Sequence, residues 1–338
     1  MNKFLYPFSV LYDLASKADR HFTKSKYLDK PVVSVGNITW GGSGKTPIVI
    51  ELLETLLKNN LNPAVLTRGY ARKEAKPILL KKDGAPASVL QTGDEPLLIF
   101  KSVPDANVII GAKRYDNALR FKKEINPDVY VLDDGFQHWK IQRDLDIVCL
   151  NAANPFGNGM IIPAGILRES PKALKRAGLI IITNSDMVPS EVLGKLQKEI
   201  FEISGKDSLT TYYGDYKYKQ INLHDNFDTG KLKDNDVYIL SGVGFAKGFR
   251  SSVEKSGIKV KGSFVLPDHA KYDKKTINSI FDKTGSAYII ITAKDAVKIA
   301  YFTDDIIKEK TAVLTVKPVF KTGKEQWEKI ILKSLRCF

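Results

Sequence analysis

A glycine-rich loop between an apolar run and a helical pattern constrains the fold of this chain more than any other feature. The loop covers residues 36–46 and reads Gly-Asn-Ile-Thr-Trp-Gly-Gly-Ser-Gly-Lys-Thr. It follows the strand-like run at 32–35 and precedes an amphipathic stretch that begins at Pro47. Strand, glycine loop and helix in this order are typical of a P-loop, whose backbone N–H groups point at phosphate oxygens. The loop is a variant, because the strict pattern has glycine where Thr39 stands.

Two side chains at the end of the loop are expected to contact a nucleotide and its metal. Lys45 is expected to reach the β- and γ-phosphates, and Thr46 to offer its hydroxyl to Mg²⁺. The preceding loop residues that we expect at the phosphates are Gly41, Gly42, Ser43 and Gly44. The alternative is a glycine-rich turn without a ligand, but the strand and helix on either side favour phosphate binding.

A second apolar run, at 129–132, ends in the carboxylates of Asp133 and Asp134. In P-loop enzymes, an aspartate at such a strand end holds Mg²⁺ directly or through water. Asp133 is the better candidate because it is the first carboxylate beyond the apolar run, and Asp134 then lies behind it or beside a phosphate. The alternative is an ordinary turn, since Asp-Gly is common in turns.

Apolar runs and helical patterns alternate along the first two thirds of the chain. This alternation predicts an α/β fold of the P-loop NTPase type, with a doubly wound, mainly parallel sheet. In such sheets ligands lie at the carboxyl ends of the strands, so the polar clusters near these ends should converge on one crevice. The expected strands are 31–35, 63–67, 107–110, 129–133, 146–150 and 178–183, and the expected helices are 47–59, 95–102 and 113–124.

The texture of the sequence changes after about residue 205, where tyrosines stand in a polar stretch rich in Lys and Asp. New apolar runs at 236–240, 259–265, 287–292 and 312–316 predict a second, smaller α/β domain. A last helical pattern surrounds Trp327. The predicted divisions are an amphipathic helix at 1–28, a P-loop domain at 29–208, an extended linker at 209–235, the smaller domain at 236–317, and a C-terminal helix at 318–338 that packs back on the P-loop domain.

The charge of the chain indicates an anionic partner. The 338 residues carry a formal net charge of +14, which suits a nucleic acid, an anionic membrane or a phosphorylated substrate. We find no RNA-binding signature and no helix-turn-helix with a basic recognition helix, so a nucleic acid is not expected. The two cysteines, Cys149 and Cys337, form neither a disulfide framework nor a zinc pattern, which favours a reducing compartment.

The N-terminal segment predicts an amphipathic helix with a basic surface. Residues 1–30 contain six Lys or Arg and three Asp, and no apolar run there is long enough to span a bilayer. The apolar stripe at helical spacing consists of Phe4, Phe8, Leu11, Ala15, Ala18 and Phe22. Two fates remain open from these residues: the helix lies in a membrane interface, or it docks on the core of the protein itself.

Taken together, the motifs of this chain resemble those of the tetraacyldisaccharide 4′-kinase family of lipid A biosynthesis, nearly from end to end. Besides the glycine loop, the segments that carry the resemblance lie at 67–70, 93–96, 132–138, 143–146, 155–159, 163–169, 241–244, 267–269 and 292–298. The sequence departs from the family pattern at Ala270, where a second histidine is common, and at Ala293, where glutamate is common.

The resemblance implies ATP- and Mg²⁺-dependent phosphorylation of the 4′-hydroxyl of a tetraacyl disaccharide 1-phosphate, which yields lipid IVA. It also favours the membrane fate of the N-terminal helix. The protein is then expected at the cytoplasmic face of the bacterial inner membrane, as a peripheral monomer on an anionic surface.

The resemblance also implies roles for residues outside the loop. Asp94 is implied as the general base on the sugar hydroxyl, and His269 as the group that orients it. Glu95 is implied near the metal and Arg114 near the transferring phosphate. The remaining implied site residues are Asn37 with the nucleotide loop, and Arg68, Arg168 and Glu169 at the crevice.

A different class of protein also contains this loop, namely P-loop GTPase or ATPase switches such as metallochaperones. The segment Thr183-Asn184-Ser185-Asp186 stands where such a switch would carry the guanine-reading Asn-Lys-x-Asp motif. The lysine of that motif is missing here, which weakens this alternative.

Overall fold

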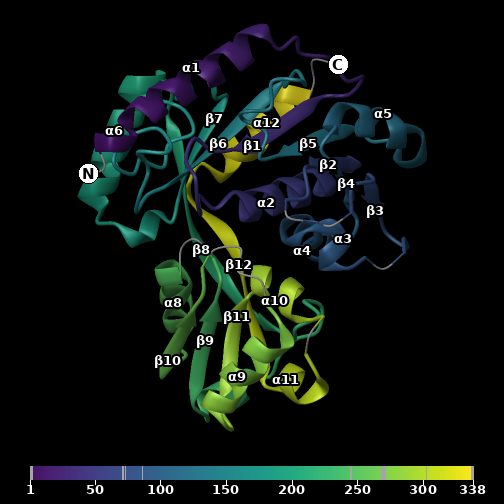
Figure 1. Ribbon diagram of the computed structural model, residues 1–338, viewed down its shortest axis with the longest axis vertical. Coiled ribbons are helices and arrows are strands. Elements are labelled where there is room, and N and C mark those ends of the chain that lie inside the picture. Colours follow the sequence, from purple (N-terminus) through teal and green to yellow (C-terminus); the bar gives the residue numbers. More distant parts are fainter. Residues whose placement is uncertain are drawn as a thin grey trace.

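One twelve-stranded sheet runs through both lobes of the molecule (Figure 1). This computed structural model describes residues 3–70, 72, 74–85, 87–243, 246–267, 272–301 and 303–335. The strand order is β10-β9-β11-β12-β8-β7-β6-β1-β5-β2-β4-β3. The strands are β1 Val32–Gly36, β2 Pro63–Thr67, β3 Ile78–Leu80, β4 Asn107–Ile110, β5 Val129–Asp133, β6 Leu145–Asn151, β7 Leu179–Thr183, β8 Ser208–Lys219, β9 Val237–Ser241, β10 Gly262–Val265, β11 Tyr288–Thr292 and β12 Thr311–Thr322.

The larger lobe is built on the parallel strands β7-β6-β1-β5-β2-β4, with β3 antiparallel at the edge. Near-continuous runs of Val, Ile and Leu form these strands because helices cover both faces of the sheet. The six strands expected in this region are confirmed within one or two residues, and the mainly parallel fold class is confirmed with them. The short strand β3 was not predicted.

Helices pack on both faces of the larger lobe. On one face lie α2 and α12, whose Trp327 is fully buried in the same apolar cluster as Leu52 and Leu56. On the other face lie α5 and α6. The helices are α1 Tyr6–Phe22, α2 Lys45–Lys58, α3 Val89–Thr92, α4 Asp94–Ser102, α5 Arg114–Ile125, α6 Ser190–Ser204, α7 Gly230–Lys233, α8 Ala246–Lys255, α9 Lys274–Thr284, α10 Ala293–Ile299, α11 Asp305–Glu309 and α12 Lys324–Leu335.

The two lobes are joined by the long strands β8 and β12, which pair antiparallel (Figure 1). The first residues of β8 pair with β7 in the larger lobe, and the first residues of β12 pair with β11 in the smaller lobe. The polar stretch expected to be extended thus begins with a twelve-residue strand, and its register with β12 shifts at two points. A continuous sheet therefore fixes how the second lobe faces the first.

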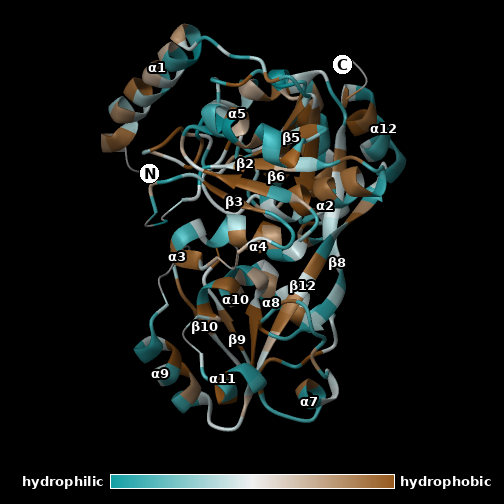
Figure 2. Cartoon of the chain, turned by 90° about the vertical axis from the view of Figure 1, so that its right-hand side faces the viewer, coloured by the Kyte–Doolittle hydropathy of each residue, from teal (hydrophilic) through white to brown (hydrophobic). Residues whose placement is uncertain are grey.

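The smaller lobe has its own parallel strands, β10-β9-β11-β12. One face is covered by α9, α10 and α11, which contribute Ile277, Ala296 and Ile307 to its core. The other face is covered by α8, whose Val253 is fully buried. This arrangement places the first turn of α10 opposite α4 of the larger lobe (Figure 2).

The apolar stripe of the N-terminal helix α1 is exposed, and the buried residue of this helix is polar. Ser9 is its buried residue; its hydroxyl donates to the Ile161 carbonyl oxygen at 2.8 Å and accepts from the Ala164 N–H at 3.0 Å. The side chains of Leu11 and Phe22 are 65% and 79% exposed. Within the described part of the chain, none of the helices has the length and apolar character that crossing a membrane requires.

Candidate active site

A cavity of about 1190 Å³ lies between the lobes at the carboxyl ends of the parallel strands. Its walls come from the glycine loop, the ends of β2 and β5, the start of α4, the start of α10, and the joining strands β8 and β12. These are the strand ends at which the sequence predicts a single crevice. Both lobes and the strands between them therefore contribute to one site.

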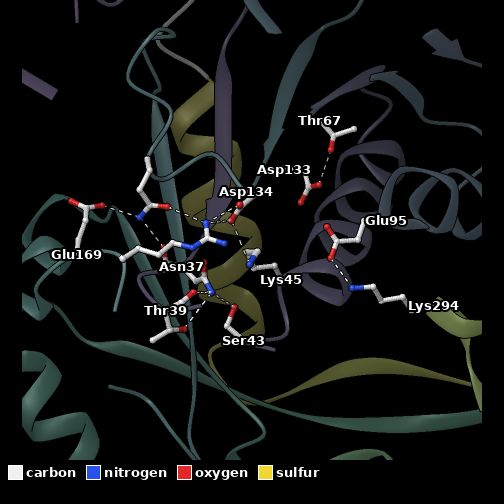
Figure 3. Close-up of polar contacts among 12 residues, drawn as sticks. Asn37, Thr39, Ser43, Lys45, Thr67, Glu95, Asp133, Asp134, Glu169 and Lys294 are labelled. Atoms are coloured by element: carbon white, nitrogen blue, oxygen red, sulfur yellow. Dashed lines mark hydrogen bonds and ion pairs between the residues drawn. The ribbon is translucent and has the colours of Figure 1, made fainter. Parts of the chain in front are cut away.

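Asn37 is fully buried and forms hydrogen bonds to residues of the glycine loop. Its amide Nδ2 donates to the Thr39 carbonyl oxygen at 2.7 Å and to the Ser43 Oγ at 2.8 Å (Figure 3). Asn37 was expected at the nucleotide, but the structure places it beneath the loop, outside the cavity wall. The cavity wall itself includes Gly41, Gly42, Ser43, Gly44, Lys45 and Thr46.

Gly44 ends the loop and begins α2 with a left-handed backbone, at φ +76°. A Cβ atom there would lie 2.5 Å from the hydroxyl oxygen of Tyr213, which reaches the loop from β8. Glycine is needed at this position both for its backbone angle and for the approach of Tyr213. The joining strand β8 is therefore in contact with the phosphate loop.

Asp134 is the centre of an ion-pair network at the end of β5. Its carboxylate lies 3.4 Å from the Lys45 Nζ and 2.8 Å from the Arg168 Nη1. Its backbone is left-handed, at φ 50°, a conformation that non-glycine residues adopt rarely. Burial alone would raise the pKa of Asp134, but Lys45 and Arg168 outweigh burial and hold that pKa well below its ordinary value.

Asp133 has the opposite electrostatic environment. It is 4% exposed, and it accepts a hydrogen bond from the Thr67 hydroxyl at 3.0 Å. Burial and the nearby carboxylates of Glu95 and Asp134 raise the pKa of Asp133 to about 6. A buried carboxylate that is repelled by its neighbours is stabilised by a bound cation.

The oxygen donors around Asp133 fit a Mg²⁺ ion. Thr46 and Glu95 line the same cavity, and Mg²⁺ prefers hydroxyl, carboxylate, phosphate and water oxygens. The described residues contain no all-protein metal site, that is, no cluster of three or more His, Cys, Asp or Glu side chains placed to hold an ion. Mg²⁺ at nucleotide sites ordinarily takes one or two carboxylates and completes its shell with phosphates and water.

The arginines expected at the crevice differ in how far they are buried. Arg114, at the start of α5, is 7% exposed, and its Nη1 donates to the Asp134 carbonyl oxygen at 3.4 Å. Burial lowers the pKa of the Arg114 guanidinium below its ordinary value, but an arginine side chain still remains charged at neutral pH. Arg68 is exposed and lines the cavity, as does Arg168, which also lies 5.8 Å from the ring centre of Trp40.

Glu169 does not line the cavity. It pairs with Arg176 at 2.9 Å and accepts a hydrogen bond from the Gln137 Nε2 at 2.8 Å. The same Nε2 atom donates to the Asn37 carbonyl oxygen at 2.9 Å. Through Gln137, Glu169 thus supports the backbone at the start of the glycine loop.

Asp94 and Glu95 form the first turn of α4. Asp94 is 8% exposed, and its Oδ1 accepts from the Glu95 N–H at 3.0 Å. Glu95 lines the cavity and lies 3.1 Å from the Nζ of Lys294, which comes from α10. His269 lies outside the described residues, as do Asp268, Ala270, Gly244 and Cys337.

Sequence reasoning assigned no role to three cavity residues, although two of them, Lys294 and His138, lie in segments that carry the family resemblance. Tyr213 and Lys294 reach the cavity from β8 and α10, and only the topology brings them there. The third is His138, in the segment that follows Asp134. Burial and the charges of Arg114 and Arg143 lower the pKa of His138 to about 3, so this imidazole is neutral at pH 7.

A glycine loop between β1 and α2, with paired aspartates at the end of the adjacent strand β5, defines a P-loop nucleotide-binding protein. A model of the tetraacyldisaccharide-1-phosphate 4′-kinase family matches residues 1–336. The chain belongs to this family, as its motifs led us to expect. The match does not favour the P-loop switch as an alternative.

Relatives named tetraacyldisaccharide 4′-kinase are similar over most of the chain. The one from Pelobacter propionicus is 32% identical over 308 residues, which cover 87% of this chain and 82% of that protein. The one from Elusimicrobium minutum is 31% identical over 332 residues, covering 95% and 88%. A crystal structure of the "apo" form of LpxK from Aquifex aeolicus, in complex with ATP, matches with a TM-score of 0.78 and 31% identity over 98% of both chains.

We predict that Asp133→Asn stabilises the nucleotide-free protein at neutral pH. The folded-state pKa of Asp133 is about 6, above the ordinary 3.8, so the folded protein binds this proton more tightly than the unfolded chain. The ionisation of Asp133 therefore lowers the free energy of unfolding as the pH rises from about 4 to 6. Above pH 6 the whole of this loss is present. At pH 7.5 the Tm of Asp133→Asn should exceed that of the wild type by at least about 2 °C.

Calorimetry at pH 7.5 and pH 4 tests this prediction. The difference should shrink toward pH 4, where Asp133 is protonated in the folded protein. The matched control is Asp207→Asn, an exposed aspartate whose substitution should leave Tm nearly unchanged. A lower Tm for Asp133→Asn at pH 7.5 would contradict this electrostatic picture.

Proposed function

We propose that the cavity transfers the γ-phosphate of ATP to the 4′-hydroxyl of a tetraacyldisaccharide 1-phosphate. This is the activity named for the family to which the chain belongs, and the ATP complex of the Aquifex aeolicus relative supports ATP as the donor. The observation that carries the proposal is the convergence of Lys45, Thr46 and Asp133 on one cavity. One chain supplies the loop, the metal-side oxygens and the base, so we propose that a monomer is sufficient.

On the donor side, the loop N–H groups and Lys45 are proposed to bind the phosphates. Lys45 now lies 3.4 Å from Asp134, and a triphosphate would compete for its ammonium while Arg168 continues to neutralise Asp134. Thr46, Asp133 and Glu95 would hold Mg²⁺, which neutralises phosphate charge when bound. Arg114 and Arg68 add positive charge where the phosphoryl group transfers.

On the acceptor side, we propose that Asp94 accepts the proton of the 4′-hydroxyl. Phosphoryl transfer needs little covalent assistance, so positioning and charge neutralisation dominate and the proton leaves late. Burial of Asp94 in the first turn of α4 keeps its carboxylate in a defined place. His269 is proposed to orient Asp94, on the resemblance to the family alone.

We further propose that α1 places the protein on the anionic cytoplasmic face of the inner membrane. The outward apolar side chains and the inward polar side, with Ser9 bonded to the body, support this over a core-docked helix. Basic residues within or just beyond the helix can contact lipid head groups, each worth about 1 kcal/mol. These residues are Lys17, Arg20, Lys24 and Lys26.

Removing the charge of Lys45 or the carboxylate of Asp133 should nearly abolish turnover. We expect Lys45→Ala and Asp133→Ala to lower kcat by about a thousandfold or more with the fold retained, because both act on the transferring phosphoryl group. Product formation from labelled ATP measures the loss. Lys58→Ala, at the exposed end of the same helix, is the control and should be active; near-normal turnover of Lys45→Ala would refute the site.

Charging the outward face of α1 should release the protein from membranes. We expect Phe8→Asp with Leu11→Asp to abolish flotation with anionic vesicles and raise the apparent KM for the lipid acceptor, but not that for ATP. The Tm should hold, since both side chains are already exposed. Val192→Asp on α6 is the control, with flotation unchanged. Unchanged flotation of the double variant with a lowered Tm would mean that the helix is docked on the core.

A further inference from the structure

Lys294 of the smaller lobe forms ion pairs with the carboxylates at the start of α4 in the larger lobe. Lys294 Nζ lies 3.1 Å from the Glu95 Oε1 (Figure 3). It lies 3.8 Å from the Asp94 Oδ2. Its side chain is only 16% exposed, and it lines the cavity with Glu95. The two carboxylates belong to the larger lobe and the ammonium to the smaller lobe, so this contact joins the lobes. Asp94 lies beside Glu95 but outside the cavity wall.

The position of Lys294 is fixed by the residues around it in α10. Thr292 caps the helix by accepting from the Asp295 N–H at 3.0 Å. Asp295 is fully buried and accepts from the Gly242 N–H at 3.1 Å and from the Tyr272 hydroxyl at 2.9 Å. The first turn of α10 is therefore tied to the loop after β9 and to Tyr272, so Lys294 projects from a rigid base.

The contact between the two helices is apolar beside this ion pair. Val297, one turn after Lys294, packs with Leu97 and Leu98 of α4 in a small buried cluster. Residues three positions apart lie on the same face of a helix, so Lys294 follows the packed face of α10 toward the cavity. The apolar packing of Val297 against α4 thus fixes the position of the Lys294 ion pair. An ion pair between two exposed side chains would lack this support.

The ammonium group of Lys294 lies beside two neighbouring carboxylates. Asp94 and Glu95 are consecutive carboxylates, and Glu95 also raises the pKa of Asp133 by repulsion. Neighbouring carboxylates repel each other, and an ammonium group that pairs with both offsets this repulsion. Among the described residues, Lys294 is the ion-pair partner of Glu95.

We propose that Lys294 is a positioning residue for phosphoryl transfer, delivered by the smaller lobe. It holds Asp94 and Glu95 in the relative arrangement that the acceptor hydroxyl and the metal-side oxygens require. The inference rests on the proposed function of Asp94 as the base. Because Lys294 pairs with the carboxylates at the start of α4, its loss should slow the chemical step and leave ATP binding largely intact.

The test is steady-state kinetics of Lys294→Met, which keeps most of the aliphatic stem and removes the charge. We expect kcat to fall about 10- to 100-fold, with the KM for ATP changed less than about twofold. Lys294→Gln, a second neutral variant, should show the same split. Lys308→Met, which breaks an exposed ion pair with Asp305 in the same lobe, is the control and should match the wild type.

A double-mutant cycle with Glu95→Gln completes the test. If Lys294 acts through Glu95, the loss in the double variant is smaller than the product of the single losses. Wild-type kcat in both neutral variants, or a double loss equal to the product, overturns the inference. Asp94→Asn separates the two claims: if it is active, the proposed base is wrong, whereas an inactive Asp94→Asn beside an unimpaired Lys294→Met overturns the role of Lys294 alone.

Discussion

The balance of charge at the carboxyl end of the sheet is the constraint on which the rest of the site depends. Parallel pairing of β1 with β5 brings Asp133 level with Val35, immediately before the glycine loop. Asp133 and Asp134 therefore stand beside the same loop, but they are neutralised differently. Asp134 pairs with two cations of its own lobe, whereas Asp133 has no ion-pair partner among the described residues. This difference is why we propose Asp133 as the ligand of a metal ion.

The second lobe is part of this balance. The start of α4 adds Asp94 and Glu95 to the same region, and α10 supplies Lys294 from across the cavity. The pairing of β8 with β12 sets the distance between the lobes, and Tyr213 of β8 approaches the glycine loop at Gly44. Loop, carboxylates and second lobe are thus linked through one continuous sheet.

Much of the larger lobe could be predicted from the sequence because its signals are local. Buried parallel strands read as apolar runs, and the glycine loop and Asp133-Asp134 each lie within a few residues of a strand end. Strand β3 has three residues and no distinctive pattern, so it was missed. The contributions of Lys294 and Tyr213 depend on contacts between segments distant in sequence, which a pattern along the chain cannot reveal.

The N-terminal helix shows the same limit in another form. Its apolar stripe predicts an amphipathic helix, but the stripe fits a membrane surface and a protein core equally well. Our proposal of a membrane surface depends on the folded chain, in which the hydroxyl of Ser9 bonds to the body and Phe22 is exposed. The roles of Asp94 and His269 stay predictions from the family resemblance.

The central claim, that the cavity moves a phosphoryl group from ATP to a lipid sugar, is tested most directly by following the label. Purified protein would be incubated with γ-labelled ATP, Mg²⁺ and a tetraacyldisaccharide 1-phosphate in mixed micelles, and the products separated. The account predicts that the label appears on the 4′-oxygen of the disaccharide in step with ADP. Release of labelled inorganic phosphate with no labelled lipid would contradict the account and would indicate a nucleotide-hydrolysing switch.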